Sequence, residues 1–269
     1  MKLPNTDRTL EVLQITDTHL YASRSGCLLG VNTDQSLDAA IRSVLAEDRS
    51  PDMVLATGDL VHDGSADGYR RIHEQFLRLA TPVYCLPGNH DEGTALRKYL
   101  RHDRVGWREK ASCGNWVIIF LDSTIAGSDA GHLLESELQR LDSTLNEAPD
   151  CHALVCLHHQ PLPIGSRWLD SMAVDNPDSF FSIIDRHAQV RGILWGHVHQ
   201  RYESQRHNVK LIATPSTCVQ FAPGSNEFTI DPIAPGYRWL RLHPDGEIET
   251  ELVRLEGIPR GLEVASGGY

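Results

Sequence analysis

The chain has 269 residues, of which 41% are hydrophobic, and a formal net charge of −11 at pH 7. This length suits one α/β enzyme domain, and the acidic balance argues against a general nucleic-acid binder, which would present a basic patch. No segment holds the roughly 20 apolar residues that span a bilayer, and residues 1–8 lack the apolar stretch of a signal peptide. We therefore expect a cytoplasmic protein without a membrane or nucleic-acid partner.

Strand and helix patterns alternate along the first 200 residues. Short apolar runs predict strands at 10–16, 53–57, 83–86, 116–121, 153–157 and 192–195. Apolar residues at helical spacing predict helices at 34–47, 65–79 and 135–145, the first of them with Thr33 as its N-cap. This alternation is typical of a layered α/β fold.

The helical period disappears after about residue 211, and the C-terminal third predicts mostly antiparallel strands. These strands are expected at 209–213, 237–242 and 248–255. We expect them to form a second sheet packed against the first. The fold class is then a four-layer α-β-β-α sandwich, with two mixed sheets flanked by helices. We expect residues 1–269 to form one domain, with metal ligands within 17–199, C-terminal strands and substrate loops within 209–255, and a tail at 256–269.

Two segments rich in proline and glycine are predicted to be surface loops. They lie at 160–180 and 221–236. Both are longer than ordinary connections between elements, so we expect them to be functional loops.

Potential metal ligands come directly after five of the predicted strands. If these strands lie parallel in one sheet, their carboxyl ends bring the side chains to one edge, where open α/β sheets bind ligands. Each motif alone is ordinary, because a lone aspartate usually caps a turn and a buried histidine is usually hydrogen-bonded core. Five in order are a joint signal for two metal ions. The motifs are Asp17-Thr18-His19, Gly58-Asp59, Gly88-Asn89-His90-Asp91, His158-His159 and Gly196-His197-Val198-His199.

The residue types within the motifs support this interpretation. Asp17 and His19 are one residue apart, so an extended backbone would direct both to the same side, and the last motif repeats this spacing. A glycine before Asp59 allows a sharp turn, and the two carboxylate oxygens can each serve one ion. Asn89 can supply a neutral carbonyl oxygen. Imidazole suits ions such as Zn, Fe and Ni, whereas oxygen ligands suit harder ions such as Mn and Mg.

The order of these motifs resembles the calcineurin-like metallophosphoesterase superfamily. The resemblance implies that one ion is held by Asp17, His19, Asp59 and His199, and the other by Asp59, Asn89, His158 and His197. It also implies that His90 is a catalytic residue near the leaving-group oxygen and not a ligand. Many members of the superfamily carry an acid three residues after the bridging aspartate. This chain has His62 there, and Asp63 one position later.

Further segments are similar to the bacterial class III 3′,5′-cyclic-AMP phosphodiesterases. They lie at 157–163, 168–170, 214–221 and 234–238. The similarity implies cyclic AMP as the small-molecule substrate and 5′-AMP as the product. It further implies iron or manganese as the metals, with Zn, Co, Ni or Mg as alternatives. Substrate contacts are expected from Asn89, His90, His159 and Thr217.

The expected reaction follows from the paired metals. Two cations roughly 3.5–4 Å apart would share a hydroxide, which would attack the phosphorus in line. His90 would then supply a proton to the departing ribose 3′-oxygen.

Other functions remain open at this point. The same fold and metals could act on a glycerophosphodiester, a nucleotide pyrophosphate or a phosphomonoester. A protein phosphatase would need an exposed groove, and a non-catalytic metal-dependent binding module would be expected to have lost a ligand. The sequence leaves open the metal identity, the base preference and the oligomeric state.

Overall fold

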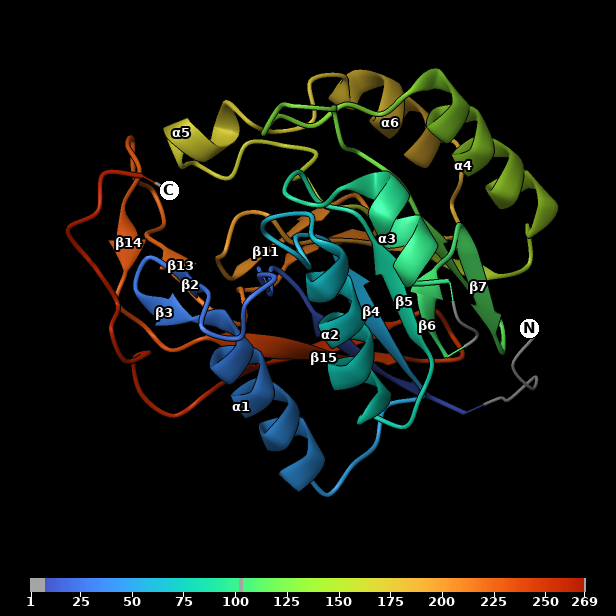
Figure 1. Ribbon diagram of the computed structural model, residues 1–269. Coiled ribbons are helices and arrows are strands. Elements are labelled where there is room, and N and C mark those ends of the chain that lie inside the picture. The colour runs from blue at the N-terminus through green and yellow to red at the C-terminus, as the bar shows by residue number, and fades with distance from the viewer. Residues whose placement is uncertain (1–7, 102–103, 269) are drawn as a thin grey trace.

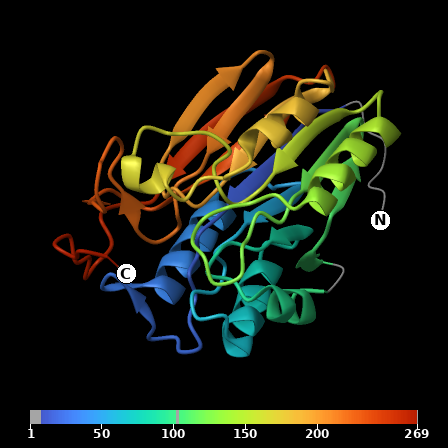
Figure 2. The same ribbon diagram turned by 90° about the horizontal axis from the view of Figure 1, so that it is seen from above.

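The computed structural model describes residues 8–101 and 104–268. Two six-stranded sheets pack face to face (Figures 1 and 2). The inner core between the sheets contains Val12 and Leu55 from one sheet and Ile118 and Leu194 from the other. Helices cover both outer faces, so the layers follow the order α-β-β-α. The predicted fold class is confirmed.

The first sheet has the strand order β16-β15-β1-β4-β5-β6. Its four parallel strands are β1 (Leu10–Ile15), β4 (Met53–Thr57), β5 (Val83–Leu86) and β6 (Val105–Trp107). Two antiparallel strands extend it, β15 (Gly236–Leu242) and β16 (Ile248–Arg254). β4 is buried throughout because both of its faces are covered, which explains its continuous apolar sequence.

The second sheet has the order β11-β12-β10-β9-β8-β7. Its parallel strands are β8 (Trp116–Phe120), β9 (His152–Cys156), β10 (Val190–Trp195) and β12 (Val209–Ala213). Both edge strands are antiparallel, β7 (Lys110–Cys113) and β11 (Tyr202–Arg206). Two small hairpin-like pairs lie outside these sheets, β2 (Cys27–Leu28) with β3 (Val31–Asn32), and β13 (Gln220–Phe221) with β14 (Ile230–Asp231).

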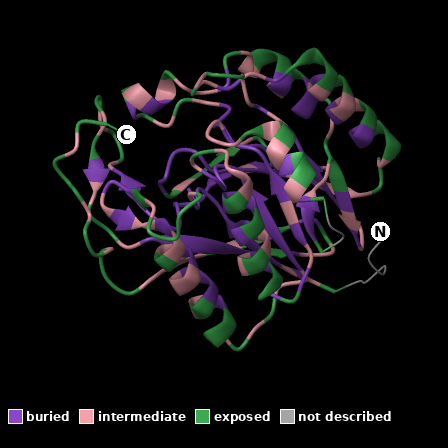
Figure 3. Ribbon diagram, in the orientation of Figure 1, coloured by how far each residue is buried: buried purple, intermediate pink, exposed green. Residues whose placement is uncertain are grey.

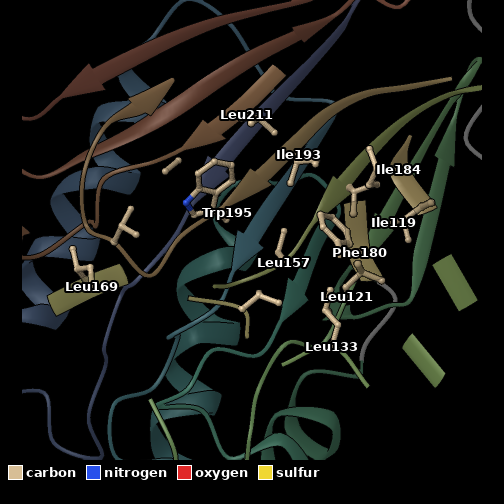
Figure 4. Close-up of a cluster of buried hydrophobic side chains, with 14 of the residues drawn as sticks. Ile119, Leu121, Leu133, Leu157, Leu169, Phe180, Ile184, Ile193, Trp195 and Leu211 are labelled. Atoms are coloured by element: carbon tan, nitrogen blue, oxygen red, sulfur yellow. The ribbon is translucent and has the colours of Figure 1, made fainter. Parts of the chain in front are cut away.

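The helices divide between the two outer faces (Figures 1 and 2). The first sheet is covered by α1 (Thr33–Ala46), α2 (Ala66–Leu77) and α3 (Gly93–Tyr99). The second sheet is covered by α4 (Glu135–Glu147), α5 (Arg167–Asp170) and α6 (Pro177–Ile184). Figure 3 shows the buried strands between these partly exposed helices. Figure 4 shows the outer core of the second sheet, a buried cluster that includes Phe180 of α6, Ile193 of β10 and Leu157.

The structure corrects three details of the sequence prediction. β15 and β16 join the first sheet and not the second, because β15 pairs with β1. The cap of α1 is Asn32 and not Thr33, since the Asn32 side chain accepts the backbone N–H of Gln35 at 2.9 Å. The two predicted loops contain short elements, namely α5 and part of α6 in 160–180 and β13 and β14 around 221–236. That residues 1–269 form one domain stays a prediction.

Candidate metal centre

The candidate ligands follow the carboxyl ends of five parallel strands, but these strands belong to two sheets. The five strands therefore do not meet the condition of sharing one sheet. The side chains meet because the two sheets pack face to face and their parallel strands end at the same edge of the sandwich. Asp17 and His19 follow β1, Asp59 follows β4, Asn89 follows β5, His158 follows β9, and His197 and His199 follow β10.

One group of donor atoms gathers around His19 and His199. Their Nε2 atoms lie 3.1 Å apart, and Nε2 of His199 lies 3.5 Å from Oδ1 of Asp17. Oδ2 of Asp59 lies 3.7 Å from Nε2 of His19. All four side chains are buried. They are the four that the superfamily resemblance assigns to one metal ion.

A second group gathers around the side-chain oxygen of Asn89. Nε2 of His158 and Nδ1 of His197 each lie 3.1 Å from this Oδ1 atom. Nε2 of His158 also lies 3.3 Å from Oδ2 of Asp59, which is the oxygen that borders the first group. Asp59 therefore lies between the two groups, with Oδ2 near both.

The hydrogen bonds of two imidazoles show that these groups suit cations. Nδ1 of His199 lies 2.8 Å from the carbonyl oxygen of Val219, and Nδ1 of His158 lies 2.9 Å from that of Thr57. A carbonyl oxygen only accepts, so each Nδ1 carries a hydrogen, and either ring in its neutral form presents a lone pair at Nε2. In that form the lone pairs and side-chain oxygens face one another, and their repulsion is relieved by a bound cation or, at His158, by a proton. The mixed nitrogen and oxygen donors fit ions such as Fe, Mn or Zn.

Asp59 dominates the electrostatics of the site. Burial acts to raise its pKa, but the neighbouring His158 and His90 hold it well below the usual range. At His158 burial acts in the other direction and lowers the pKa. Attraction to Asp59 outweighs this effect and raises the pKa of His158 to about 9. The shared carboxylate therefore favours positive charge at the boundary between the two groups.

The backbone at most of the predicted ligands is left-handed and not extended. Five of them have positive φ, namely Asp17 (53°), His19 (46°), Asp59 (51°), His197 (65°) and His199 (47°). The expectation that the pairs at 17 and 19 and at 197 and 199 alternate along a strand is therefore wrong. β1 ends at Ile15 and β10 at Trp195, so both pairs lie in loops. Positive φ is uncommon for residues other than glycine and clusters at functional sites.

Hydrogen bonds between the loops hold this conformation. The backbone N–H of Asp17 donates to the Gly58 carbonyl at 3.0 Å, and that of His19 donates to the Asp59 carbonyl at 2.9 Å. The backbone N–H of His197 donates to Oδ1 of Asp17 at 3.0 Å, which links the two sheets. The sharp turn predicted at Gly58 is confirmed by its φ of +95°.

His90 lies beside the two groups. Its backbone N–H donates to Oδ1 of Asp59 at 2.9 Å, and its half-buried ring lies with its centroid 5.0 Å from that of His19. The ring also stacks on His62, with centroids 4.4 Å apart. Burial, together with the neighbouring His90, lowers the pKa of His62 to about 4.

Asp91 has a structural role that the motif did not reveal. Its carboxylate accepts the backbone N–H groups of Leu60, Val61 and Gly88, each at 3.0 Å, and the hydroxyl of Tyr69 at 2.9 Å. Burial and the charge of Asp59 raise its pKa to about 6. Asp91 therefore connects the loops that follow β4 and β5. The sequence signal that could have indicated this role is the position of Asp91 directly after Asn89 and His90.

His159 and Thr217 are both buried. Nδ1 of His159 lies 2.8 Å from Oγ of Ser123, and burial, together with His158, lowers the His159 pKa to about 3. Thr217 is 0% exposed, so direct contact with a substrate would need movement of its segment. The predicted substrate contacts of both residues stay predictions. Ser123, whose sequence context carried no signal, was missed.

The segment 214–221 returns to the site, as expected, and supports the proposed ligands. The ring of Phe221 stacks on His199 with centroids 4.3 Å apart and an angle of 14°. The hydroxyl of Ser216 donates to the carbonyl oxygen of Asp17 at 2.7 Å. Together with the Val219 carbonyl, these contacts orient ligands from both sheets.

Within the described residues, no helix is long and apolar enough to cross a membrane.

Comparison with known proteins agrees with the fold and the site. The chain is 40% identical over 266 residues to the 3′,5′-cyclic adenosine monophosphate phosphodiesterase CpdA of Pseudomonas aeruginosa, covering 99% of this chain and 97% of the relative. It is 39% identical over 261 residues to the protein of the same name in Escherichia coli K12, covering 97% of this chain and 95% of the relative.

A similar fold is found in a dimetal phosphatase from Danio rerio, with a TM-score of 0.61. The match covers 93% of this chain and 100% of that one, but at 15% identity it bears on the fold alone. The family model for calcineurin-like phosphoesterases matches residues 10–201, which include every predicted metal ligand. The chain therefore belongs to the calcineurin-like phosphoesterase family.

Proposed function

We propose that this protein is a 3′,5′-cyclic-nucleotide phosphodiesterase that hydrolyses cyclic AMP to 5′-AMP at a site for two metal ions. The observation that carries the proposal is the meeting of seven donor side chains in two groups that share Oδ2 of Asp59. The substrate is supported by relatives that are named cyclic-AMP phosphodiesterases and match nearly the whole chain.

The family and the buried clusters of histidine and aspartate imply a dimetal site. The ligands of one ion would be Asp17, His19, Asp59 and His199, and those of the other Asp59, Asn89, His158 and His197. Iron or manganese fits this mixture of imidazole and oxygen donors. When bound, two cations would neutralise charge on the phosphate and make hydroxide available near neutral pH.

His90 has the position of a proton donor beside the reacting phosphate. Its ring borders His19 but belongs to neither of the two proposed ligand sets. The ribose 3′-oxygen is a poor leaving group, so a proton delivered to it as the P–O bond breaks would lower the barrier. Loss of that bond leaves the phosphate on the 5′-oxygen, which makes 5′-AMP the product.

A substrate panel tests the proposal. The purified protein, supplied with Mn²⁺ or Fe²⁺, is incubated with cyclic AMP, cyclic GMP, bis-p-nitrophenyl phosphate and glycerophosphocholine, and products are separated by chromatography. We expect 5′-AMP from cyclic AMP, and no turnover by Asp59→Ala. A main product of 3′-AMP would overturn the proposed bond cleavage. Faster hydrolysis of the glycerophosphodiester than of cyclic AMP would favour the alternative substrate.

A further inference from the structure

His62 lies in contact with two functional side chains but belongs to neither proposed ligand set. Its Nδ1 lies 3.1 Å from Nδ1 of His19, and its ring stacks on His90 with centroids 4.4 Å apart and an angle of 20°. The ring of Tyr21 also lies against it, at 4.8 Å. The backbone N–H of His62 donates to the Leu20 carbonyl at 2.8 Å, which anchors the residue to the loop after β1.

The contact between His62 and His19 determines which nitrogen of His19 can bind a cation. Nε2 of His19 faces His199 and Asp59, so it must present a lone pair there. A neutral imidazole carries one hydrogen, which is then on Nδ1 of His19. Nδ1 of His62 is placed to accept it. Metal-binding histidines generally have such a partner, which sets both the tautomer and the ring orientation.

The stack with His90 restrains a second group. His90 is half-buried, so packing from the remainder of the protein leaves part of its ring open. A flat neighbour at 4.4 Å limits rotation of that ring out of its plane. A proton donor must be held in register with the leaving oxygen, and small misplacements reduce the rate strongly.

A third metal site is the competing explanation, because ligand atoms of His19, His62 and His90 lie within 4.8 Å of one another. Ring geometry argues against it. A cation binds in the plane of an imidazole, and the nearly parallel planes of His62 and His90 run beside each other and do not meet at one point. Nδ1 of His19 must also keep its hydrogen if Nε2 is a ligand.

We propose that His62 is a positioning residue, which accepts the Nδ1 hydrogen of His19 and holds the ring plane of His90. The second of these roles rests on the proposed function. The first concerns metal binding alone.

Two substitutions separate the roles. His62→Asn keeps an acceptor near the place of Nδ1 but removes the ring, whereas His62→Phe keeps a flat ring but removes the acceptor. His207→Asn serves as the control, because His207 is an exposed turn residue with positive φ, which asparagine tolerates. Thermal denaturation identifies any variant that fails to fold. If one of the two variants fails, the other still tests its role: His62→Phe tests the contact with His19, and His62→Asn tests the stack with His90.

The first measurement is metal affinity, by titration with Mn²⁺ against a competing chelator. We expect His62→Phe to bind one of two equivalents about 10–100-fold more weakly, the usual effect of losing such a partner, and His62→Asn to resemble wild type. Unchanged affinity in His62→Phe would overturn the contact with His19 as a determinant of binding. A third equivalent bound by wild type and lost in His62→Phe would overturn the positioning role in favour of a third site.

The second measurement compares kcat on cyclic AMP with kcat on bis-p-nitrophenyl phosphate, whose leaving group needs little protonation. We expect His62→Asn at saturating metal to lose at least about tenfold in kcat on cyclic AMP and much less on the nitrophenyl ester. His62→Phe should keep the wild-type ratio. An unchanged ratio in His62→Asn would overturn the role toward His90. Because the chelator titration needs no substrate, its result stands even if cyclic AMP proves not to be the substrate.

Discussion

At the scale of single side chains, His90 differs from its neighbours in what its ring faces. The proposed ligands direct a nitrogen or an oxygen at another donor atom, at distances of 3.1 to 3.7 Å. His90 instead contacts Asp59 through its backbone N–H and presents its ring beside the site. Substitution of its side chain should therefore leave the metal ions in place.

We predict that His90→Ala retains two metal equivalents and loses about 10²–10⁴-fold in kcat on cyclic AMP, the usual contribution of a positioned proton donor. The loss should be much smaller for bis-p-nitrophenyl phosphate, since nitrophenolate departs without a proton. Elemental analysis and steady-state kinetics on both substrates provide the test. Equal losses on the two substrates would show that His90 positions the substrate and does not donate the proton.

Residue types at the site could be predicted from the sequence, but their conformations could not. A ligand type directly after a buried strand is visible as a pattern, as with Asp59 after β4. Positive φ at Asp17 or His197 leaves no such pattern, because it depends on hydrogen bonds between loops far apart in the chain. The role of Asp91 was missed for the same reason, since its partners come from two other segments.

At the scale of elements, the turn after β4 depends on Gly58. Its φ is +95°, and a Cβ atom there would lie 2.3 Å from Nδ1 of His158. Moving that ring aside would break the hydrogen bond that its Nδ1–H donates to the Thr57 carbonyl. A side chain at position 58 would therefore disturb both the turn and a proposed ligand.

We predict that Gly58→Ala lowers the free energy of unfolding by about 2–5 kcal/mol, through left-handed strain and overpacking together. It should also weaken metal binding. Gly127→Ala is the matched control, because Gly127 has a φ of +73° but no atom within 4 Å of the added Cβ. It should lose only about 1–2 kcal/mol, from the strain alone. Urea unfolding and metal content measure the difference, and equal losses would contradict the predicted clash.

A buried polar network joins the two sheets behind the site. Arg238 of β15 donates to the Ala213 carbonyl at 3.0 Å and to Glu203 at 2.7 Å, both in the second sheet. It also donates to Thr214 at 2.9 Å, and Thr214 donates in turn to Gln14 of β1. The guanidinium group is 0% exposed, so its removal leaves several of these partners without a donor.

We predict that Arg238→Met lowers the free energy of unfolding by about 3 kcal/mol, at the lower end for a broken buried ion pair because Glu203 is 33% exposed. Arg201→Met is the control. Arg201 pairs with the same glutamate but is 62% exposed, so its removal should change stability by less than about 0.5 kcal/mol. Similar urea midpoints for the two variants would argue against the network as a link between the sheets.

The elements that the sequence predicted share strong periodicity or continuous burial, as in α1 and β4. Those it missed are short or exposed. β11 is a polar edge strand with no fully buried residue, and β6 has three residues. The place of β15 could not be predicted, because strand patterns show that a strand exists but not which distant strand it pairs with.

At the scale of the whole molecule, the site lies across the packed edge of both sheets. The first sheet contributes Asp17, His19, Asp59 and Asn89, and the second contributes His158, His197 and His199. Ions bound there would join the sheets and would be released on unfolding, so metal binding should stabilise the fold. Relief of repulsion among the converging donor atoms adds to the effect.

We predict that removing the metals with a chelator lowers Tm and that added Mn²⁺ restores it. At a hundredfold excess over Kd, one bound ion contributes about 2.7 kcal/mol, which corresponds to a shift of about 5–10 °C for a chain of this size. If residues 1–269 form one domain, circular dichroism in the far and near ultraviolet should report the same single transition in both states. Asp59→Ala, which lacks the carboxylate shared by the two groups, should show a much smaller shift with Mn²⁺. An equal shift in this variant would place the stabilising ion elsewhere, and two separate transitions in wild type would show that the sheets unfold independently.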